Sequence, residues 1–246
     1  MIPIQNTVPN RYPATVTYVL IAVNCLVFIF QQTLDPLEEQ LFLQAFALVP
    51  ARYFAIFVAG ARPVDAADFL PFFTMMFLHG GWLHLIFNMW MLWLFGPTLE
   101  DRLGHGPFLL FYIVCGVLAA VTHALAEPTS TVPALGASGA IAGVLGGFMW
   151  LFPWAQIIVL IPIVFIPLFF EVRAAVFAGV WFLIQLFQGT IQLFMASPGG
   201  GVAWWAHVGG FVAGLSLVPW MVRSAVAYRT YYRDEGIYGF SPQGRS

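Results

Sequence analysis

Apolar stretches long enough to cross a lipid bilayer recur along this chain and leave little room for a soluble fold. A membrane-crossing helix needs about 20 mostly apolar residues. Hydrophobic residues make up 61% of the sequence and charged residues only 8%, too few for the solvated surface of a soluble domain. We therefore expect an all-α, polytopic membrane protein with six transmembrane helices. The expected helices lie near residues 16–32, 81–99, 107–126, 138–153, 172–194 and 204–224.

The placement of arginine predicts the orientation of these helices. Six spans put both termini on the same side of the membrane, and loops on the cytoplasmic side are enriched in basic residues. Only Arg52 and Arg62 fall on the side away from the termini. We therefore expect cytoplasmic termini in a plasma or inner membrane. The arginines on the side of the termini are Arg11, Arg102, Arg173, Arg223, Arg229, Arg233 and Arg245.

The domain organisation follows from the same pattern. Residues 1–224 are expected to form one membrane domain, and residues 225–246 a disordered cytoplasmic tail. The first residues lack a basic region and a cleavage site, so we expect no removable signal peptide.

A proline-rich segment follows the fourth apolar stretch, where Pro153, Pro162 and Pro167 leave no helix of spanning length. We interpret that segment as a kinked connection anchored in the cytoplasmic interface.

The stretch 33–80 is too long for a plain connection between helices, so it is expected to carry short helices in the outer interface. Its residues 41–60, LFLQAFALVPARYFAIFVAG, leave a seventh span open as an alternative. Pro50 breaks a helix there and Arg52 is expensive in lipid, which favours the interfacial interpretation. A true span at this place would reverse the side on which everything after it lies.

Two classes of function are disfavoured by composition. The net charge of −2, with no lysine in the sequence, gives no basic face for nucleic acid. Cys25 and Cys115 both lie in apolar runs, which does not indicate a disulfide framework or a thiolate metal site. We expect neither a metal nor an organic cofactor.

Ser138 begins a short apolar segment. About 15 residues separate it from Pro153, which as a helix reach roughly 22 Å and fall short of a ~30 Å hydrocarbon core. We therefore expect this helix to start below the outer surface, where polar backbone must face protein or a water-filled cavity. The unpaired N–H groups at a helix start also favour a nearby developing negative charge.

His207 is predicted to lie about one turn into the last helix, at a depth similar to that of Ser138. Small residues let the two helices approach closely: Gly139, Gly143 and Gly146 on one, and Ala206, Gly210 and Gly214 on the other. A serine hydroxyl becomes a nucleophile when a neighbouring histidine takes its proton. Ser138 and His207 are therefore a candidate catalytic dyad.

His84 and Asn88 are four residues apart and share one face near the outer end of the second helix. Both can donate hydrogen bonds, as the oxyanion of an acyl-transfer intermediate requires. Each group taken alone also has a structural interpretation, because serine, asparagine and histidine often serve as packing or interhelical hydrogen-bonding groups in membranes. Together they supply a nucleophile, a base and an oxyanion site, which indicates a hydrolase.

Four sequence blocks resemble the rhomboid family of intramembrane serine proteases. In chain order they are HGGWLHLIFNM, GPTLEDRLG, GASGAIAG (with Gly136 and Gly139) and AHVGGFVAG (with Gly210), and the resemblance extends over residues 16–222. It implies a six-helix core that cleaves transmembrane segments of other proteins. It also implies that Ser138 is the nucleophile and His207 the base, with His84 and Asn88 in the oxyanion hole.

The resemblance assigns other residues to structure. Glu100, Arg102 and Gly104 match a motif at the junction of the second and third helices, where we expect ion pairing or carbonyl capping. His79 is expected to organise the first loop, and His105 and His123 are interpreted as structural.

This chain departs from the family pattern at two places. Leu70-Pro71 stands where many members carry Trp-Arg in the first loop, so the loop must be anchored differently. Ala142 stands where an aromatic residue often stacks on the histidine, which leaves Trp204, Trp205 and Phe211 as candidates to orient His207. Without an acidic third member, we predict a dyad.

Two rival functions stay open. A catalytically silent relative would bind membrane segments without cutting them. A transporter would use His84, Asn88 and His207 as ligand or proton groups, but it predicts an inverted repeat and intramembrane acids that the sequence lacks. The oligomeric state and the natural substrate are not readable from the sequence.

Overall fold

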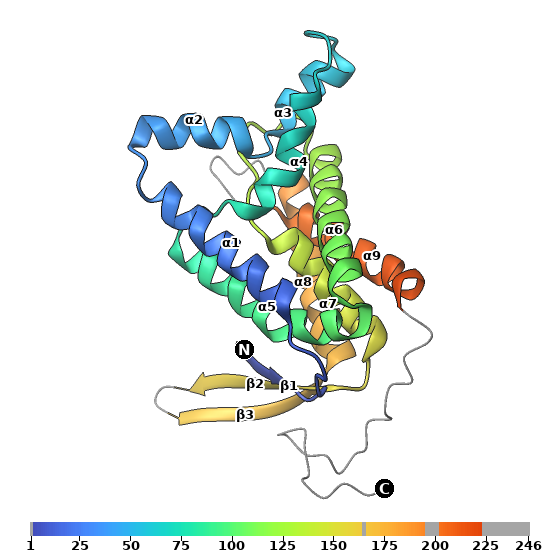
Figure 1. The fold of residues 1–246 in the computed structure, drawn as a ribbon. Helices are drawn as coiled ribbons and strands as arrows, with labels where there is room; N and C mark the ends of the chain where they lie inside the picture. The colour runs from blue at the N-terminus through green and yellow to red at the C-terminus, as the bar shows by residue number, and fades with distance from the viewer. Residues whose placement is uncertain (1, 164–165, 195–201, 223–246) are drawn as a thin grey trace, which may run out of the picture.

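A computed structural model describes residues 2–163, 166–194 and 202–222 of the chain (Figure 1). Its long helices form a bundle with a small sheet at one end and short helices at the other (Figure 1). Every apolar stretch expected to be helical is a helix, with bounds that differ from the expected ones by a few residues. These helices are α1 (Thr15–Gln31), α5 (Trp82–Leu103), α6 (His105–Ala126), α7 (Ser138–Leu151), α8 (Ala174–Phe194) and α9 (Trp204–Met221).

The helices differ in how well they match the thickness of a bilayer. Among the described residues, α6 and the Ala174–Leu193 part of α8 are long and apolar enough to cross one. A third candidate is α5 taken with the preceding segment Ala66–Phe77, from which it is bent by 82°. Helices α1 and α7 are apolar but shorter. The fold is thus mostly helical and compatible with a membrane bundle, and the number of spans stays a prediction.

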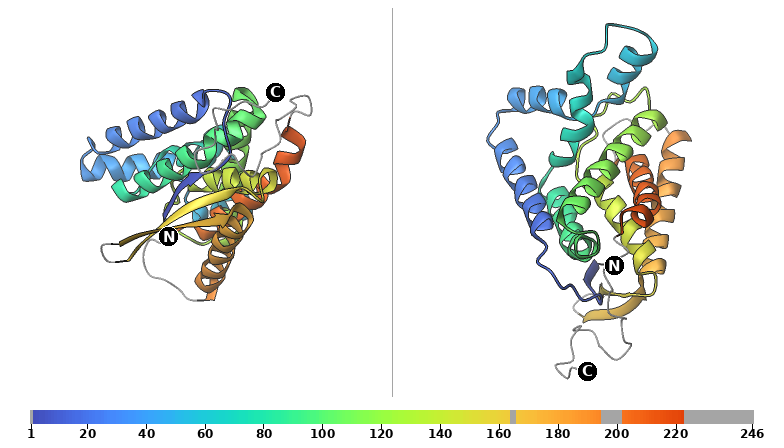
Figure 2. Two further views of the ribbon diagram at one scale, coloured as in Figure 1. Left: turned by 90° about the horizontal axis from the view of Figure 1, so that it is seen from below. Right: turned by 45° about the vertical axis from the view of Figure 1, so that its right-hand side comes forward.

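Helix α7 lies at the centre of the bundle, where it contacts α5, α6, α8 and α9 (Figure 2). All residues from Gly139 to Phe148 are buried, as expected for a helix that is apolar on every side. Glycine allows its backbone to touch that of α9. A Cβ atom on Gly210 would lie 1.9 Å from the carbonyl oxygen of Gly139, and one on Gly214 equally close to that of Gly143. The predicted close approach of these two helices is therefore present.

A three-stranded antiparallel sheet corrects the expectation of an all-α fold. Strand β1 (Ile2–Asn6) pairs with β2 (Gln156–Ile163), which pairs with β3 (Ile166–Arg173), in the order β1-β2-β3. The segment expected to be a kinked connection is therefore a β-hairpin. The three strands lie across the end of the bundle where the chain begins (Figure 1).

The prolines of this hairpin fit the sheet because of where they fall. Pro167 is in the edge strand β3 and is paired with Pro162 of the central strand. The pairing of β1 with β2 extends only as far as Leu160, so the missing N–H of Pro162 is not needed by β1. The three prolines exclude a long helix here, as expected, but they are compatible with an antiparallel β-hairpin.

The first loop contains several short helices. They are α2 (Pro36–Phe46), α3 (Pro50–Tyr53), the π-helix η1 (Phe54–Val58), the 3₁₀ helix η2 (Ala66–Phe69), α4 (Leu70–Thr74) and the 3₁₀ helix η3 (Met75–Phe77). Asp35 caps α2 by accepting hydrogen bonds from Leu37 and Glu38, and Pro50 begins α3. That these helices lie in the outer interface stays a prediction.

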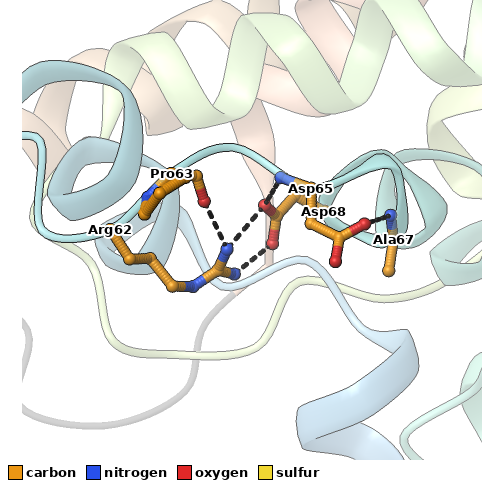
Figure 3. Close-up of polar contacts among 5 residues, drawn as sticks. All are labelled: Arg62, Pro63, Asp65, Ala67 and Asp68. Carbon is orange, nitrogen blue, oxygen red and sulfur yellow. Dashed lines mark hydrogen bonds and ion pairs between the residues drawn. The ribbon is translucent and has the colours of Figure 1, made fainter.

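Polar contacts hold the tip of this loop together (Figure 3). The Arg62 guanidinium donates to both carboxylate oxygens of Asp68 and to the carbonyl oxygen of Pro63. Asp68 also accepts from the Asp65 amide at 2.8 Å, and the Asp65 side chain accepts from Ala67. This arrangement holds the loop together just before Leu70-Pro71, the first of the two places where the sequence departs from the pattern it resembles.

The other end of the loop is tied to α1. The side chain of Gln31 donates to the His79 carbonyl oxygen at 3.2 Å and accepts from the His79 amide at 3.1 Å. The His79 ring lies 5.2 Å from that of His84, centroid to centroid. The backbone of His79 therefore ties the loop to α1 just before α5, and the organising role expected for His79 stays a prediction.

Glu100 joins three helices at the end of the bundle near the sheet. Its carboxylate accepts hydrogen bonds from the amides of Val16 and Thr17 at 2.8 Å, from the Thr17 hydroxyl at 2.6 Å and from His105 Nδ1 at 2.5 Å. It thus caps the start of α1, where Ala14 offers no side-chain cap. The Glu100 carbonyl oxygen accepts from Gly104, whose φ of 84° turns the chain into α6.

The third residue of this motif, Arg102, places its guanidinium 4.8 Å from the ring centroid of Phe152. The Glu100 carboxylate therefore connects α1, α5 and α6, and the ion pairing or carbonyl capping expected of this motif as a whole stays a prediction. The predicted tail, 225–246, and Arg223 lie outside the described residues.

Candidate active site

Ser138 is the first residue of α7, and His207 is the fourth residue of α9. The Nε2 atom of His207 lies 2.8 Å from the Ser138 hydroxyl oxygen. The contacts of Gly139 with Gly210 and of Gly143 with Gly214 bring the backbones of α7 and α9 together. This close approach places the two side chains at hydrogen-bonding distance. The geometry is that of a hydroxyl hydrogen-bonded to an imidazole.

His84 and Asn88 project from α5 toward the same place. A Cβ atom on Gly136 would lie 2.7 Å from His84 Nε2 and 3.5 Å from Asn88 Nδ2, so both nitrogens face the backbone two residues before Ser138. Gly136 has a φ of 121°, which a side chain would strain. The turn into α7 therefore requires glycine both for its conformation and for the approach of these two donors.

The donors of this cluster are poorly satisfied within the described part of the chain. Asn88 is buried, and its Nδ2 is without a hydrogen-bond partner there. His84 Nδ1 accepts from the Gly80 amide at 3.4 Å, which leaves Nε2 as the nitrogen directed at Gly136. Such a donor pair, next to the free N–H groups at the start of α7, can bind a negatively charged oxygen.

Two side chains of α8 complete the surroundings of His207. Gln185 Oε1 lies 2.7 Å from His207 Nδ1, and the Trp181 ring lies 5.7 Å from the imidazole at an angle of 35°. Of the three aromatic residues considered from the sequence, Trp204 contacts the imidazole edge-on at 6.2 Å. Trp205 donates to the Gly189 carbonyl oxygen, and Phe211 contacts Trp181 and Phe182.

Sequence reasoning missed Gln185 and Trp181. The available signal for Gln185 was an amide in the middle of an apolar stretch, the same kind of signal that singled out Asn88. Sequence spacing gave no register between α8 and α9, so no pairing with His207 could be assigned. His105 and His123 lie outside this set of contacts, since His105 pairs with Glu100 and His123 Nδ1 is 3.9 Å from Glu127.

The described residues contain no cluster of metal-ligating side chains. Within residues 2–163, 166–194 and 202–222, no three His, Cys, Asp or Glu side chains are grouped so that they could hold an ion. The chemistry available to the cluster is that of a hydroxyl, two imidazoles and two amides.

Comparison with known proteins connects this geometry to a family. The Rhomboid domain model matches residues 66–224. Rhomboid protein 1, mitochondrial, of Saccharomyces cerevisiae is 29% identical over 223 residues, which cover 88% of this chain and 56% of that protein. Putative rhomboid protease YdcA of Bacillus subtilis is 40% identical over 78 residues, 32% of this chain and 39% of the relative.

Rhomboid protease GluP of Bacillus subtilis is 39% identical over 77 residues, 31% of this chain and 15% of the relative. The chain thus spans about half or less of the length of each of these relatives. The family model, in contrast, covers more than half of this chain and includes α5 to α9. The chain belongs to the rhomboid family, a membrane-embedded family that includes proteases.

Proposed function

We propose that this protein is an intramembrane serine endopeptidase that cleaves transmembrane segments of other proteins. The observation that carries the proposal is the 2.8 Å contact between Ser138 Oγ and His207 Nε2, next to donors on α5 that face the same turn. Membership in a family with named proteases supports it. The proposed location is the plasma or inner membrane, with cytoplasmic termini and the site toward the outer face.

The proposed reaction uses the residues in the following roles. His207 removes the proton of Ser138 as the hydroxyl attacks the substrate carbonyl carbon, and the developing oxyanion accepts hydrogen bonds from His84, Asn88 and the Ser138 amide. The protonated His207 then gives its proton to the leaving amine. Water, activated by the same imidazole, hydrolyses the acyl-enzyme and frees Ser138.

The substrate must offer a peptide bond that is not locked in a helix. Backbone amides inside a transmembrane helix are already hydrogen-bonded, and only irregular backbone can enter a polar site. We therefore propose substrates with one transmembrane segment in which glycine, proline or small residues weaken the helix near the outer face. Oligomeric state plays no part in this proposal.

The test is proteolysis by the purified protein in proteoliposomes that contain such a single-span substrate. We expect Ser138→Ala to lower the rate by about 10⁴-fold or more, because the nucleophile is lost. Ser216→Ala is the matched control, since Ser216 is an exposed serine of α9 and should be replaceable without loss. A fluorophosphonate probe should label the native protein and the control but not Ser138→Ala.

Other outcomes identify the rival functions. Substrate binding without cleavage or probe labelling would indicate a silent relative that only holds membrane segments. Solute flux into vesicles that survives Ser138→Ala would indicate a transporter. Cleavage that persists in Ser138→Ala removes Ser138 as the nucleophile.

A further inference from the structure

Gln185 is a buried amide on α8, and its neighbours from Trp181 to Phe187 along the helix are all apolar. Only 5% of its surface is exposed. Burial of an amide costs free energy unless its polar atoms find partners. Both polar atoms of Gln185 have one, and one of the two partners is the imidazole of His207.

The orientation of the Gln185 amide is determined by its second contact. Its Nε2 donates to the Trp181 carbonyl oxygen at 3.3 Å, one turn earlier on α8. A flipped amide would place its oxygen against that carbonyl oxygen, and two acceptors repel each other. The Oε1 atom must therefore be the one that faces His207 Nδ1 at 2.7 Å.

This orientation selects one tautomer of the imidazole. A carbonyl-type oxygen only accepts, so the partner nitrogen, Nδ1, must carry a proton. In a neutral imidazole the other nitrogen then has a free lone pair, and Nε2 is the atom that lies 2.8 Å from the Ser138 hydroxyl. The contact with Gln185 thus leaves the imidazole in the only neutral form that can accept the serine proton.

We infer that Gln185 is a positioning residue that holds the base of the site in this tautomer and rotamer, acting through His207. The inference rests on the proposed function and extends the expected dyad by a neutral third member. An amide suits this depth in a membrane protein, because a carboxylate on an apolar helix would carry a much larger desolvation cost. Trp181 flanks the imidazole from the same helix, where Ala142 of α7 offers no ring.

Kinetics of Gln185→Leu test the assignment. We expect kcat to fall about 10- to 10²-fold with KM within about twofold, because proton transfer loses its positioned base while substrate binding is untouched. Gln185→Glu, which restores an acceptor for Nδ1, should recover most of this loss. Gln188→Leu is the matched control, since Gln188 is an exposed glutamine on the same helix and should leave kcat unchanged.

A ¹⁵N NMR spectrum of histidine-labelled protein in micelles tests the tautomer without any substrate. The His207 signals, assigned by their loss in His207→Ala, should show a proton on Nδ1 in the native protein and a mixture of tautomers in Gln185→Leu. A proton on Nε2 in the native protein, or an unchanged spectrum in Gln185→Leu, contradicts the inference. This readout holds even if the protein cleaves nothing, so it separates a failure of this inference from a failure of the proposed function.

The kinetic outcomes are equally decisive. A kcat for Gln185→Leu within twofold of the native value, while Ser138→Ala is inactive, overturns the role of Gln185 and leaves the proposed function intact. A loss in Gln185→Leu that Gln185→Glu does not recover, with a lowered unfolding temperature, assigns Gln185 to packing instead. If Gln185→Leu does not fold, the native spectrum alone decides.

Discussion

Two buried polar clusters lie at different levels of the same bundle, and they differ in how completely their hydrogen bonds are made. The carboxylate of Glu100 is 1% exposed and accepts from two amides, a hydroxyl and an imidazole. Near Ser138, by contrast, the amide nitrogen of Asn88 is buried without a partner in the described residues. A satisfied cluster serves the fold, whereas donors held without a partner are available to a substrate.

Glu100→Ala tests whether the Glu100 cluster serves the fold, and it is expected to have the largest effect. The change leaves the buried amide and hydroxyl of Thr17 and the part-buried amide of Val16 without their acceptor, and we expect a loss of about 3–5 kcal/mol in the free energy of unfolding. Denaturant titration in detergent micelles measures it. The kcat of the folded fraction should stay at the native value.

His105→Ala is the graded control for this prediction. His105 is half exposed and provides one of four contacts to Glu100, so we expect a loss of about 1 kcal/mol. An effect of Glu100→Ala on kcat at unchanged stability would place Glu100 in the reaction and break the distinction between the two clusters.

Asn88→Ala tests whether the cluster near Ser138 serves the reaction. Removing one donor from an oxyanion site lowers kcat by about 10²–10³-fold. Stability should not fall, because the Nδ2 atom makes no hydrogen bond to any of the described residues that would be lost. Asn24→Ala is the control: Asn24 is a buried asparagine of α1 that donates to the Leu20 carbonyl oxygen, and its loss should leave kcat unchanged. A destabilised Asn88→Ala with native kcat would make Asn88 an interhelical contact.

The smallest effect is expected at the contact between Asp68 and Arg62, whose side chain is about half exposed. The Arg62 guanidinium, by hydrogen bonding, holds the pKa of the Asp68 carboxyl below its ordinary value. Its contribution to loop order is therefore present above that ordinary value and is lost as the pH falls through the lowered one. Hydrogen exchange of residues 62–70 at neutral pH should speed up in Arg62→Ala, while the global unfolding temperature stays the same.

The contact between Arg62 and Asp68 refines the comparison because its hydrogen bonds are made while the Arg62 side chain stays about half exposed to solvent. Arg62→Lys keeps the charge without the planar fork and should show intermediate exchange. Equal exchange in the native protein and in Arg62→Ala would mean that the loop is held by its apolar packing alone.

Much of the helical core was predictable from the sequence because apolar runs of spanning length have few alternative structures. The sheet could not be predicted, because its strands β2 and β3 also lie in an apolar run. A mostly apolar run with three prolines, such as 153–172, does not distinguish a strand from a broken helix by periodicity. Its pairing partner, Ile2–Asn6, lies about 150 residues away, and nothing local marks it as a strand.

At the site, the sequence indicated which residues carry the chemistry but not how they are held. Ser138, His207, His84 and Asn88 could be selected because polar groups in apolar helices are expensive. The contact of Gln185 with His207 depends on the rotation of α8 against α9, which tertiary packing determines. The glycines at the α7–α9 contact were readable from their spacing, since only small residues permit backbone contact.

The sheet also constrains how the chain is threaded through a bilayer. Strands β1 and β2 can pair only if both lie on one side of the membrane, so the chain between Asn6 and Gln156 must cross it an even number of times. Single crossings by α1, α5, α6 and α7 satisfy this parity. A further span at residues 41–60 would make the number odd and separate the strands. Backbone pairing at one end of the molecule thereby constrains the topology of a loop at the other.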